Sequence, residues 1–297
     1  MAQATTHRTL ATDVWRQFRR HKGAVTGAVV LSIIVLACSV GPLIYWHDPF
    51  VSDLGARNLG PSLGHAFGTD IQGRDVLARI LIGGRISLAV GLTAMLIGIF
   101  LGTLVGTLAG YFRRLDGLLM RLTDLFLALP ILPLLLVCIM LFREPLRALL
   151  GPEAGIFLLI VFVIGLTSWM QTARVVRGEV LSVKNKEFVQ AATSIGTRDR
   201  NIIIRHILPN VMSPVIVSAS LAIASAILLE SALSFLGLGF PSDLPTWGRL
   251  LYDSQDYIGI APLRVIAPGI MISATVLCVN FIGDGLRDAL DPKLRSR

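Results

Sequence analysis

Two patterns in the sequence have the residue types of a chemical site, but neither has the surroundings that its chemistry requires. Residues 60–64, GPSLG, have the G-x-S-x-G spacing of a nucleophile elbow, and His65 and Asp70 follow closely. That spacing exposes a reactive serine only on a turn between a strand and a helix, and no strand pattern precedes it here. The five histidines and three cysteines show no ligand spacing such as H-x3-H or C-x-x-C. We therefore predict no catalytic residue and no metal site on this chain.

The sequence also lacks the phosphate-binding motif of P-loop nucleotide-binding proteins. No G-x4-G-K-[ST] pattern occurs, so the chain has no phosphate-binding loop of that kind. The net charge of +8 does not indicate a nucleic-acid partner, because no soluble basic face accompanies it. If the protein performs work, we expect its energy source in another chain.

Five charged residues remain as candidates for function. Glu230 lies in an apolar run, where an acid is costly, so it either lines a pathway or gate or bonds to local groups. Asp124 is an acid near the inner end of another apolar run and is a second pathway candidate. Asp70, Arg74 and Asp75 form a cluster in which Arg74 can pair with either acid. That cluster predicts either a structural ion pair or a docking surface.

The elements that must position these residues are hydrophobic helices. The chain is 54% hydrophobic and 15% charged, with a mean hydropathy of +0.71, whereas soluble domains carry about 25% charged residues. Apolar runs of about 18 residues or more can cross a bilayer as helices. Six such runs predict an all-α membrane protein with spans at roughly 24–45, 86–110, 118–141, 155–173, 211–236 and 265–283.

The distribution of positive charge predicts the orientation of these spans. If the N-terminus is cytoplasmic, 19 of the 27 Lys and Arg residues fall in inner segments and 8 in outer loops. Positive residues near span ends favour the cytoplasmic face, so we expect both termini inside the cell. The basic stretch 12–23 is expected to lie along the inner membrane surface. The first apolar run is too long for a signal peptide and lacks a small-x-small cleavage pattern, which indicates an anchor.

Glycines and prolines predict how two spans are shaped. Glycine occurs at every fourth position from 98 to 110, which places these glycines on one helix face. Small residues there allow another helix to approach closely, either within the same subunit or from a second one. Pro130 and Pro133 remove backbone donors from the third span and predict a kink. The kink is either part of a pathway wall or a packing feature.

A basic segment at 177–210 interrupts the apolar pattern between the fourth and fifth spans. Apolar residues at helical intervals predict one helix over 174–195, and Gly196 ends it. Thr197 can cap a second, short helix that ends at Pro209.

The small side chains of Ala191 and Ala192 suggest what this segment does. A short helix with a small-residue patch suits docking into a groove on a soluble partner. The alternative is a cytoplasmic hairpin that packs only on its own spans.

The same segment resembles the signature of ABC importer permeases, which reads EAA-x3-G-x9-I-x-L-P. Here QAATSIG is followed by nine residues and HILP, with Gln190 in place of the glutamate and His206 in place of the first isoleucine. Glutamine at the first position and RHILPN at the end are similar to the peptide and nickel branch of the family. Other segments of the chain resemble the second permease subunit of that branch. They are GTDIQGRDVLARI, RISLAVGL, LAGYFRRLD, MRLTDLFLALP, LSFLGLGFPSDLPTWG and GDGLRDALDPKL.

The resemblance implies a type I ABC importer permease (MetI-like) fold of six transmembrane helices, with a cytoplasmic coupling helix between spans four and five. Residues 1–67 would form the tail, first anchor and outer loop, and residues 68–297 the core permease domain. The residues expected to couple to an ATPase are Gln190, Ala191, Ala192, Gly196, Thr197, Arg198, Arg205, His206, Leu208 and Pro209.

The resemblance also implies partners and a function. The partners would be a second permease subunit, two cytoplasmic ATP-binding subunits that hold ATP and magnesium, and an extracytoplasmic substrate-binding protein, in a bacterial inner membrane. No cofactor is expected on this chain. The implied function is ATP-driven import of dipeptides or oligopeptides by alternating access. The alternatives are nickel or another small solute and, from another class, an ion-coupled secondary transporter, although we find no inverted repeats or midplane ion site.

Overall fold

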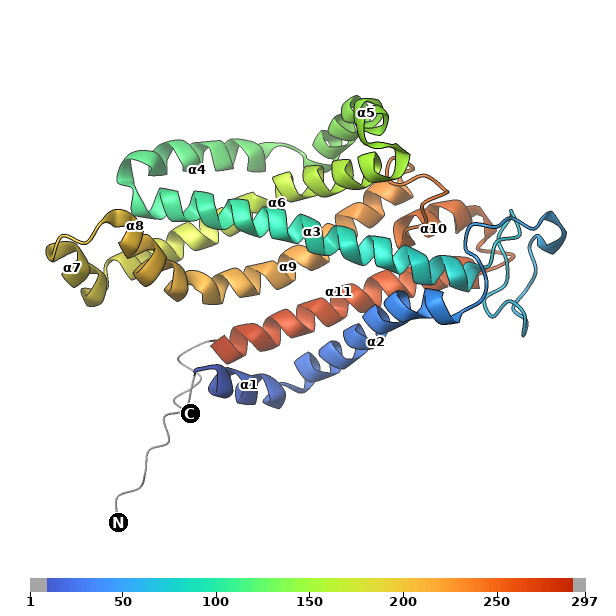
Figure 1. Ribbon diagram of the computed structural model, residues 1–297, viewed down its shortest axis with the longest axis horizontal. Coiled ribbons are helices and arrows are strands. Elements are labelled where there is room, and N and C mark those ends of the chain that lie inside the picture. Colours follow the sequence, from blue (N-terminus) through green and yellow to red (C-terminus); the bar gives the residue numbers. More distant parts are fainter. Residues whose placement is uncertain (1–9, 291–297) are drawn as a thin grey trace, which may run out of the picture.

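The computed structural model describes residues 10–290, and their side chains from Val14 onward, as an elongated bundle of helices (Figure 1). Both chain ends, for which a cytoplasmic location is predicted, lie outside the described residues. No strand occurs within 10–290. The helices are α1 (Leu10–Arg20), α2 (Lys22–Ile44), α3 (Val76–Tyr111), α4 (Arg113–Ala128), α5 (Ile131–Leu150), α6 (Pro152–Lys184), α7 (Glu187–Ser194), α8 (Asp199–Ile202), α9 (Leu208–Phe235), α10 (Trp247–Ser254) and α11 (Leu263–Leu290).

Five of the described helical segments are long and apolar enough to cross a membrane. They are α2, α3, α6, α11 and the continuous segment Asp199–Phe235, which joins α8 to α9 through a π-helical turn at Ile203–Ile207. The bent pair of α4 and α5 makes a sixth candidate when it is counted as one span. The all-α membrane fold is therefore confirmed. Several helices extend beyond their apolar runs, and α3 has 36 residues.

The third span differs from the kinked helix that its prolines predict. The helix ends at Ala128 and restarts at Ile131, and the two parts are bent by 88°. Pro130 is the N-cap of α5, where its missing N–H costs no helical hydrogen bond. In Figure 1, α4 follows the long axis of the bundle while α5 turns out of that direction. The break is therefore a change of direction between two helices.

The glycine row of α3 packs against α6 of the same chain. A Cβ added at Gly102 would lie 2.6 Å from the Thr172 Cβ, and one at Gly106 would lie 2.5 Å from the Ala173 carbonyl oxygen. No real Cβ tolerates such distances, so only glycine allows the two backbones to approach this closely. The prediction of tight packing within the subunit is confirmed, and α3 and α6 form the central pair of the bundle.

The bundle has two distinct ends (Figure 1). The α7 end carries α7 and α8, and its apolar cluster includes Val180, Val183, Val189 and Ile202. The α10 end carries α10 and the loop between α2 and α3, around the buried indole of Trp247. The Trp247 indole N–H donates to the Ile80 carbonyl at 3.1 Å and fixes α10 on α3.

Candidate functional site

The turn after α7 is exposed at the α7 end of the molecule. The N–H of Thr197 donates to the Ala192 carbonyl at 3.1 Å, and that of Gly196 donates to the Thr193 carbonyl at 3.0 Å. With Gly196 at φ +76°, these two bonds form a Schellman motif, in which a left-handed residue ends a helix. Gly196 therefore ends the helix as predicted.

Three details of the predicted helix–turn–helix are wrong. The single helix expected over 174–195 is divided, because α6 ends at Lys184 and α7 starts at Glu187. Thr197 does not cap the next helix, since the N-cap of α8 is Arg198 and no side chain caps it. The short helix also does not end at Pro209. It continues through the π-helical turn into α9. Pro209 lies in the first turn of α9, where a proline is tolerated.

The side chains of α7 divide into an inner and an outer face. Val189 and Ala192 are buried in the apolar cluster of the α7 end, so Ala192 packs on its own subunit and does not contribute to an outer patch. Gln190 and Ala191 are exposed, and Ile195 is 82% exposed. The turn therefore presents an uncovered apolar side chain within the described structure.

The remaining residues of the segment lie on its flank. Arg198, Arg205 and Pro209 are exposed, and Leu208 is half-buried. The half-buried imidazole of His206 lies beside the Phe188 ring, with centroids 6.2 Å apart. The structure therefore brings the predicted coupling residues to one end of the molecule, with most of their side chains facing outward.

A polar contact that the sequence did not reveal holds this segment to the spans. The Tyr111 hydroxyl, at the end of α3, donates to the Asp199 carboxylate at 2.6 Å. The Lys184 ammonium, at the end of α6, donates to the Tyr111 carbonyl at 2.5 Å. These contacts border a groove of about 720 Å³ that also includes Gln190 and Thr193. The first bond joins α8 to the end of α3, and the second joins the end of α3 to the end of α6.

A second pocket lies midway along the bundle, where the α4–α5 break faces α6 and α9. It has a volume of about 460 Å³, and Leu129 and Ile131, on either side of Pro130, are part of its wall. Hydroxyl and amide groups alternate with apolar side chains, and none of the described lining residues is charged. The polar members are Thr167, Ser168, Gln171, Thr172, Ser218 and Ser225. Pro130 and Pro133 are themselves exposed and shape the break.

Comparisons with known proteins identify the family to which these features belong. Residues 94–296 match the family model "Binding-protein-dependent transport system inner membrane component". The chain belongs to this family. Residues 9–61 also match the N-terminal transmembrane domain of oligopeptide transport permease C.

The permease has curated relatives along almost its whole length. It is 43% identical to the oligopeptide transport system permease protein OppC of Salmonella typhimurium over 291 residues, which cover 97% of this chain and 93% of that protein. It is 39% identical to the dipeptide transport system permease protein DppC of Alkalihalophilus pseudofirmus, over 96% of this chain and 90% of that protein. A solved structure of the MetNI methionine ABC transporter, in inward-facing conformations, has a chain that matches with a TM-score of 0.56 at 17% identity. The match covers 73% of this chain and 96% of that one, and supports the MetI-like fold.

Glu230 of the permease is held by local bonds rather than facing the pocket. Its carboxylate is fully buried and accepts hydrogen bonds from the Ser87 hydroxyl of α3 at 3.1 Å and the Ser234 hydroxyl at 2.8 Å. The Ser87 hydroxyl in turn accepts the N–H of Trp247 at 3.2 Å. Of the two predicted roles, the geometry is that of structural bonding between α3, α9 and α10.

Asp124 is also paired. Its carboxylate accepts a hydrogen bond from Arg174 of α6, and both side chains are about half exposed. An exposed pair of this kind contributes little to stability, on the order of 0–1 kcal/mol. Its role as a pathway candidate stays a prediction.

The acids at the α10 end form a buried ion-pair network. Arg74 donates to the Asp70 carboxylate at 2.8 Å, and Arg79, a residue the sequence did not single out, donates to it at 2.6 Å. Burial alone would raise the pKa of Asp70, but the Arg74 N–H and the guanidinium groups of Arg79 and Arg74 outweigh it and hold that pKa below its ordinary value. Arg79 also reaches Asp253 at 3.7 Å. The cluster thus anchors the loop to α3 and α10.

Asp75 has a different role from its neighbour Asp70. Its carboxylate accepts the Ala78 N–H at 2.8 Å and so forms the N-cap of α3.

The nucleophile pattern at 60–64 forms no triad, because the Ser62 hydroxyl accepts the main-chain N–H of His65 at 3.1 Å in an irregular loop.

Proposed function

We propose that this chain is a permease subunit of an ATP-driven peptide importer and that the turn between α7 and α8 couples it to an ATP-binding subunit. The observation that carries the proposal is the protruding Schellman turn at Gly196 with its exposed apolar tip. The neighbouring Tyr111–Asp199 bond offers a mechanical link to α3. ATP-driven closure of the partner would displace α7 and α8, tilt α3 and α6, and change the side to which the pathway opens.

The pathway is proposed at the pocket beside the α4–α5 break. Its lining of hydroxyl, amide and apolar groups suits a peptide, whose backbone offers donors and acceptors and whose side chains vary. A nickel ion would require imidazole, carboxylate or thiolate ligands, and none of the described lining residues carries one. The relatives named for oligopeptide and dipeptide transport support the same substrate class.

The proposed assembly contains a second permease subunit, two cytoplasmic ATP-binding subunits and an extracytoplasmic substrate-binding protein. The α7 end would face the cytoplasm, together with both termini, and the α10 end would face outward. The excess of Lys and Arg in the segments on the α7 side supports this orientation. ATP and magnesium would bind only to the partner subunits.

Transport by the reconstituted complex tests the proposal. Proteoliposomes containing both permeases, the ATP-binding subunits and the binding protein are loaded with ATP, and uptake of labelled dipeptides, longer peptides and radioactive nickel is measured. The proposal predicts peptide uptake that requires ATP hydrolysis and persists when ionophores collapse ion gradients. Uptake of nickel alone would overturn the peptide assignment. Uphill uptake by this chain without an ATP-binding subunit would overturn the coupling mechanism.

A further inference from the structure

Three potential metal ligands meet in the loop between α2 and α3, away from the turn and the pocket. His47, His65 and Asp75 each offer one ligand atom, and these atoms lie within 4.8 Å of one another. We propose that these residues bind a divalent transition-metal ion, with zinc as the favoured ion. The proposal does not depend on the coupling mechanism or on the transported substrate.

The ligand set matches zinc chemistry. Two imidazoles and one carboxylate form the three-ligand sites in which zinc keeps an open fourth position for water. Zinc binds these groups at about 2.0–2.2 Å, so neighbouring ligand atoms in a tetrahedral site lie roughly 3.3–3.5 Å apart. The His65 Nδ1 atom lies 2.9 Å from an Asp75 carboxylate oxygen. An ion between these two atoms would replace their hydrogen bond after a displacement of about 0.5 Å.

His47 supplies an independent observation that points to a ligand. Its Nδ1 atom is buried and has no hydrogen-bond partner among the described residues. A buried polar atom without a partner is costly, and the great majority of such atoms are satisfied. The His47 ring lies against that of His65, with centroids 4.7 Å apart, and one of its two ring nitrogens lies within 4.8 Å of the two other ligand atoms. A metal ion bound there would bring both imidazoles and the carboxylate into one coordination shell in a part of the structure that leaves a buried His47 nitrogen without a partner.

The ligands are held in place by contacts outside the cluster. One carboxylate oxygen of Asp75 caps α3, and the other, which accepts from the Tyr45 hydroxyl at 3.1 Å, is the one that faces His65. The side chain of Asp75 is 1% exposed. The main chain of His65 is fixed by Ser62, whose hydroxyl accepts its N–H and whose N–H donates to its carbonyl at 2.9 Å. Orienting contacts of this kind are a regular feature of metal sites.

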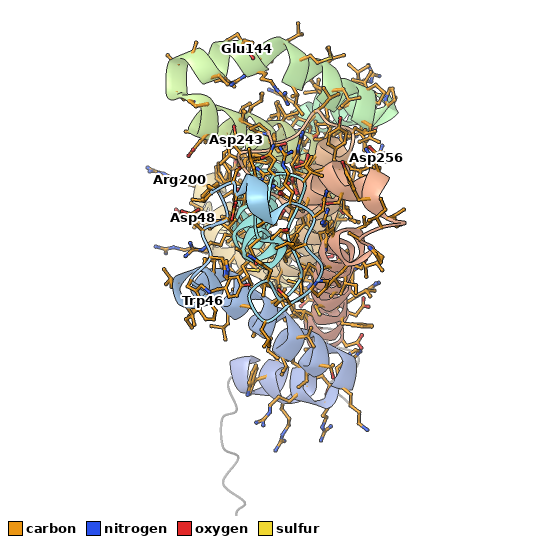
Figure 2. The ribbon with its side chains drawn as sticks, turned by 90° about the vertical axis from the view of Figure 1, so that its right-hand side faces the viewer. Trp46, Asp48, Glu144, Arg200, Asp243 and Asp256 are labelled. Atoms are coloured by element: carbon orange, nitrogen blue, oxygen red, sulfur yellow. The ribbon has the colours of Figure 1, made fainter. Side chains whose placement is uncertain are left out.

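The site would join separate parts of the α10 end. His47 follows the end of α2, His65 lies in the middle of the loop, and Asp75 starts α3. Figure 2 views the molecule from this end and labels Trp46 and Asp48, the sequence neighbours of His47. A bound ion would therefore fasten the loop to two membrane helices. Without an ion, the hydrogen bond between His65 and Asp75 is the one described that joins these three residues to each other.

Metal analysis of the assembled transporter tests the proposal. The complex is purified through a tag without histidine, stripped with a chelator, and dialysed against zinc or cobalt. Metal content is measured by mass spectrometry, and cobalt binding by its d–d absorption. The comparison uses wild type, the double variant His47→Gln and His65→Gln, and the single variant Asp75→Asn, with His21→Gln as the matched control because His21 lies at the opposite end of α2.

The proposal predicts one more zinc per chain in wild type and in the His21 control than in the double variant. Asp75→Asn is expected to weaken zinc binding by tenfold or more. Wild type should also show tetrahedral cobalt absorption that the double variant lacks. Retention of the partner subunits during purification confirms that each variant is folded. Equal zinc content and equal cobalt spectra in wild type and in a folded double variant would overturn the proposal.

Discussion

The left-handed turn at Gly196 gives the sharpest quantitative prediction. Gly196 has φ +76°, and a Cβ built there meets no heavy atom within 4 Å. A Cβ at this position therefore meets no steric clash within the described part of the chain, so the cost of alanine arises from the backbone conformation. A left-handed conformation costs an L-residue about 1–2 kcal/mol, which lowers the population of the observed turn roughly 5- to 30-fold relative to its alternatives. Asparagine tolerates this region better than alanine, and a β-branched residue tolerates it least.

The assay is the ratio of peptide imported to ATP hydrolysed by proteoliposomes that contain the complete complex. Gly196→Asn is the matched control and is expected to stay near wild type. Gly196→Ala should reduce the ratio several-fold, and Gly196→Val should reduce it most, while all variants still insert into the membrane and ATP hydrolysis persists. A wild-type ratio in Gly196→Val would refute the reasoning, because the turn conformation would then be irrelevant to coupling. Equal losses in the asparagine and valine variants would refute the backbone explanation.

Three further predictions concern packing, burial and pH. Gly102→Ala forces α3 away from α6 and should cost about 1–3 kcal/mol, measured by thermal unfolding in detergent, whereas Gly178→Ala, with open space at its Cβ, should be neutral or stabilising. Glu230→Leu removes the acceptor of two buried serine hydroxyl donors, at about 1–3 kcal/mol each. Glu230→Gln should unfold much closer to wild type, and equal losses in the two variants would contradict the bonding role. Because the pKa of Asp70 is lowered, its stabilisation is present above about pH 4 and is lost as the pH falls through the lower folded-state pKa. Asp70→Asn should therefore unfold at a lower temperature than wild type at pH 7, and a gap that fails to shrink below about pH 4 would contradict this.

The spans, the glycine row and the turn at Gly196 could be predicted because each rests on local information. Hydropathy over a single helix identifies a span. A spacing of four residues identifies one helix face, although it could not show that α6 was the partner. Glycine after a helical pattern indicates a left-handed helix end. The boundary between α6 and α7 also has a local signal in the sequence, the polar run Lys184-Asn185-Lys186. The prediction of a single helix rested on apolar periodicity alone and did not take this run into account.

The parts that could not be predicted depend on residues distant in sequence. Arg79, which pairs with Asp70 nearby in the sequence, also reaches Asp253 because α10 folds back onto the start of α3. The Tyr111–Asp199 bond joins the end of α3 to α8 in the same way. His47 and His65 show no ligand spacing, yet the irregular loop brings their rings together. The prolines predicted a kink in the third span, whereas the structure divides it into α4 and α5, bent by 88°, with α5 packed against α6.

Site-specific photo-crosslinking from the tip of α7 tests the central claim most directly. In one sample of the assembled transporter, a benzophenone amino acid replaces the exposed Ala191. In a second sample it replaces Leu63, which is fully exposed at the opposite end. The account predicts that position 191 crosslinks to an ATP-binding subunit, with a yield that changes when the nucleotide state changes, and that position 63 does not. Crosslinks from position 191 to the substrate-binding protein, or none to an ATP-binding subunit in any nucleotide state, would contradict it.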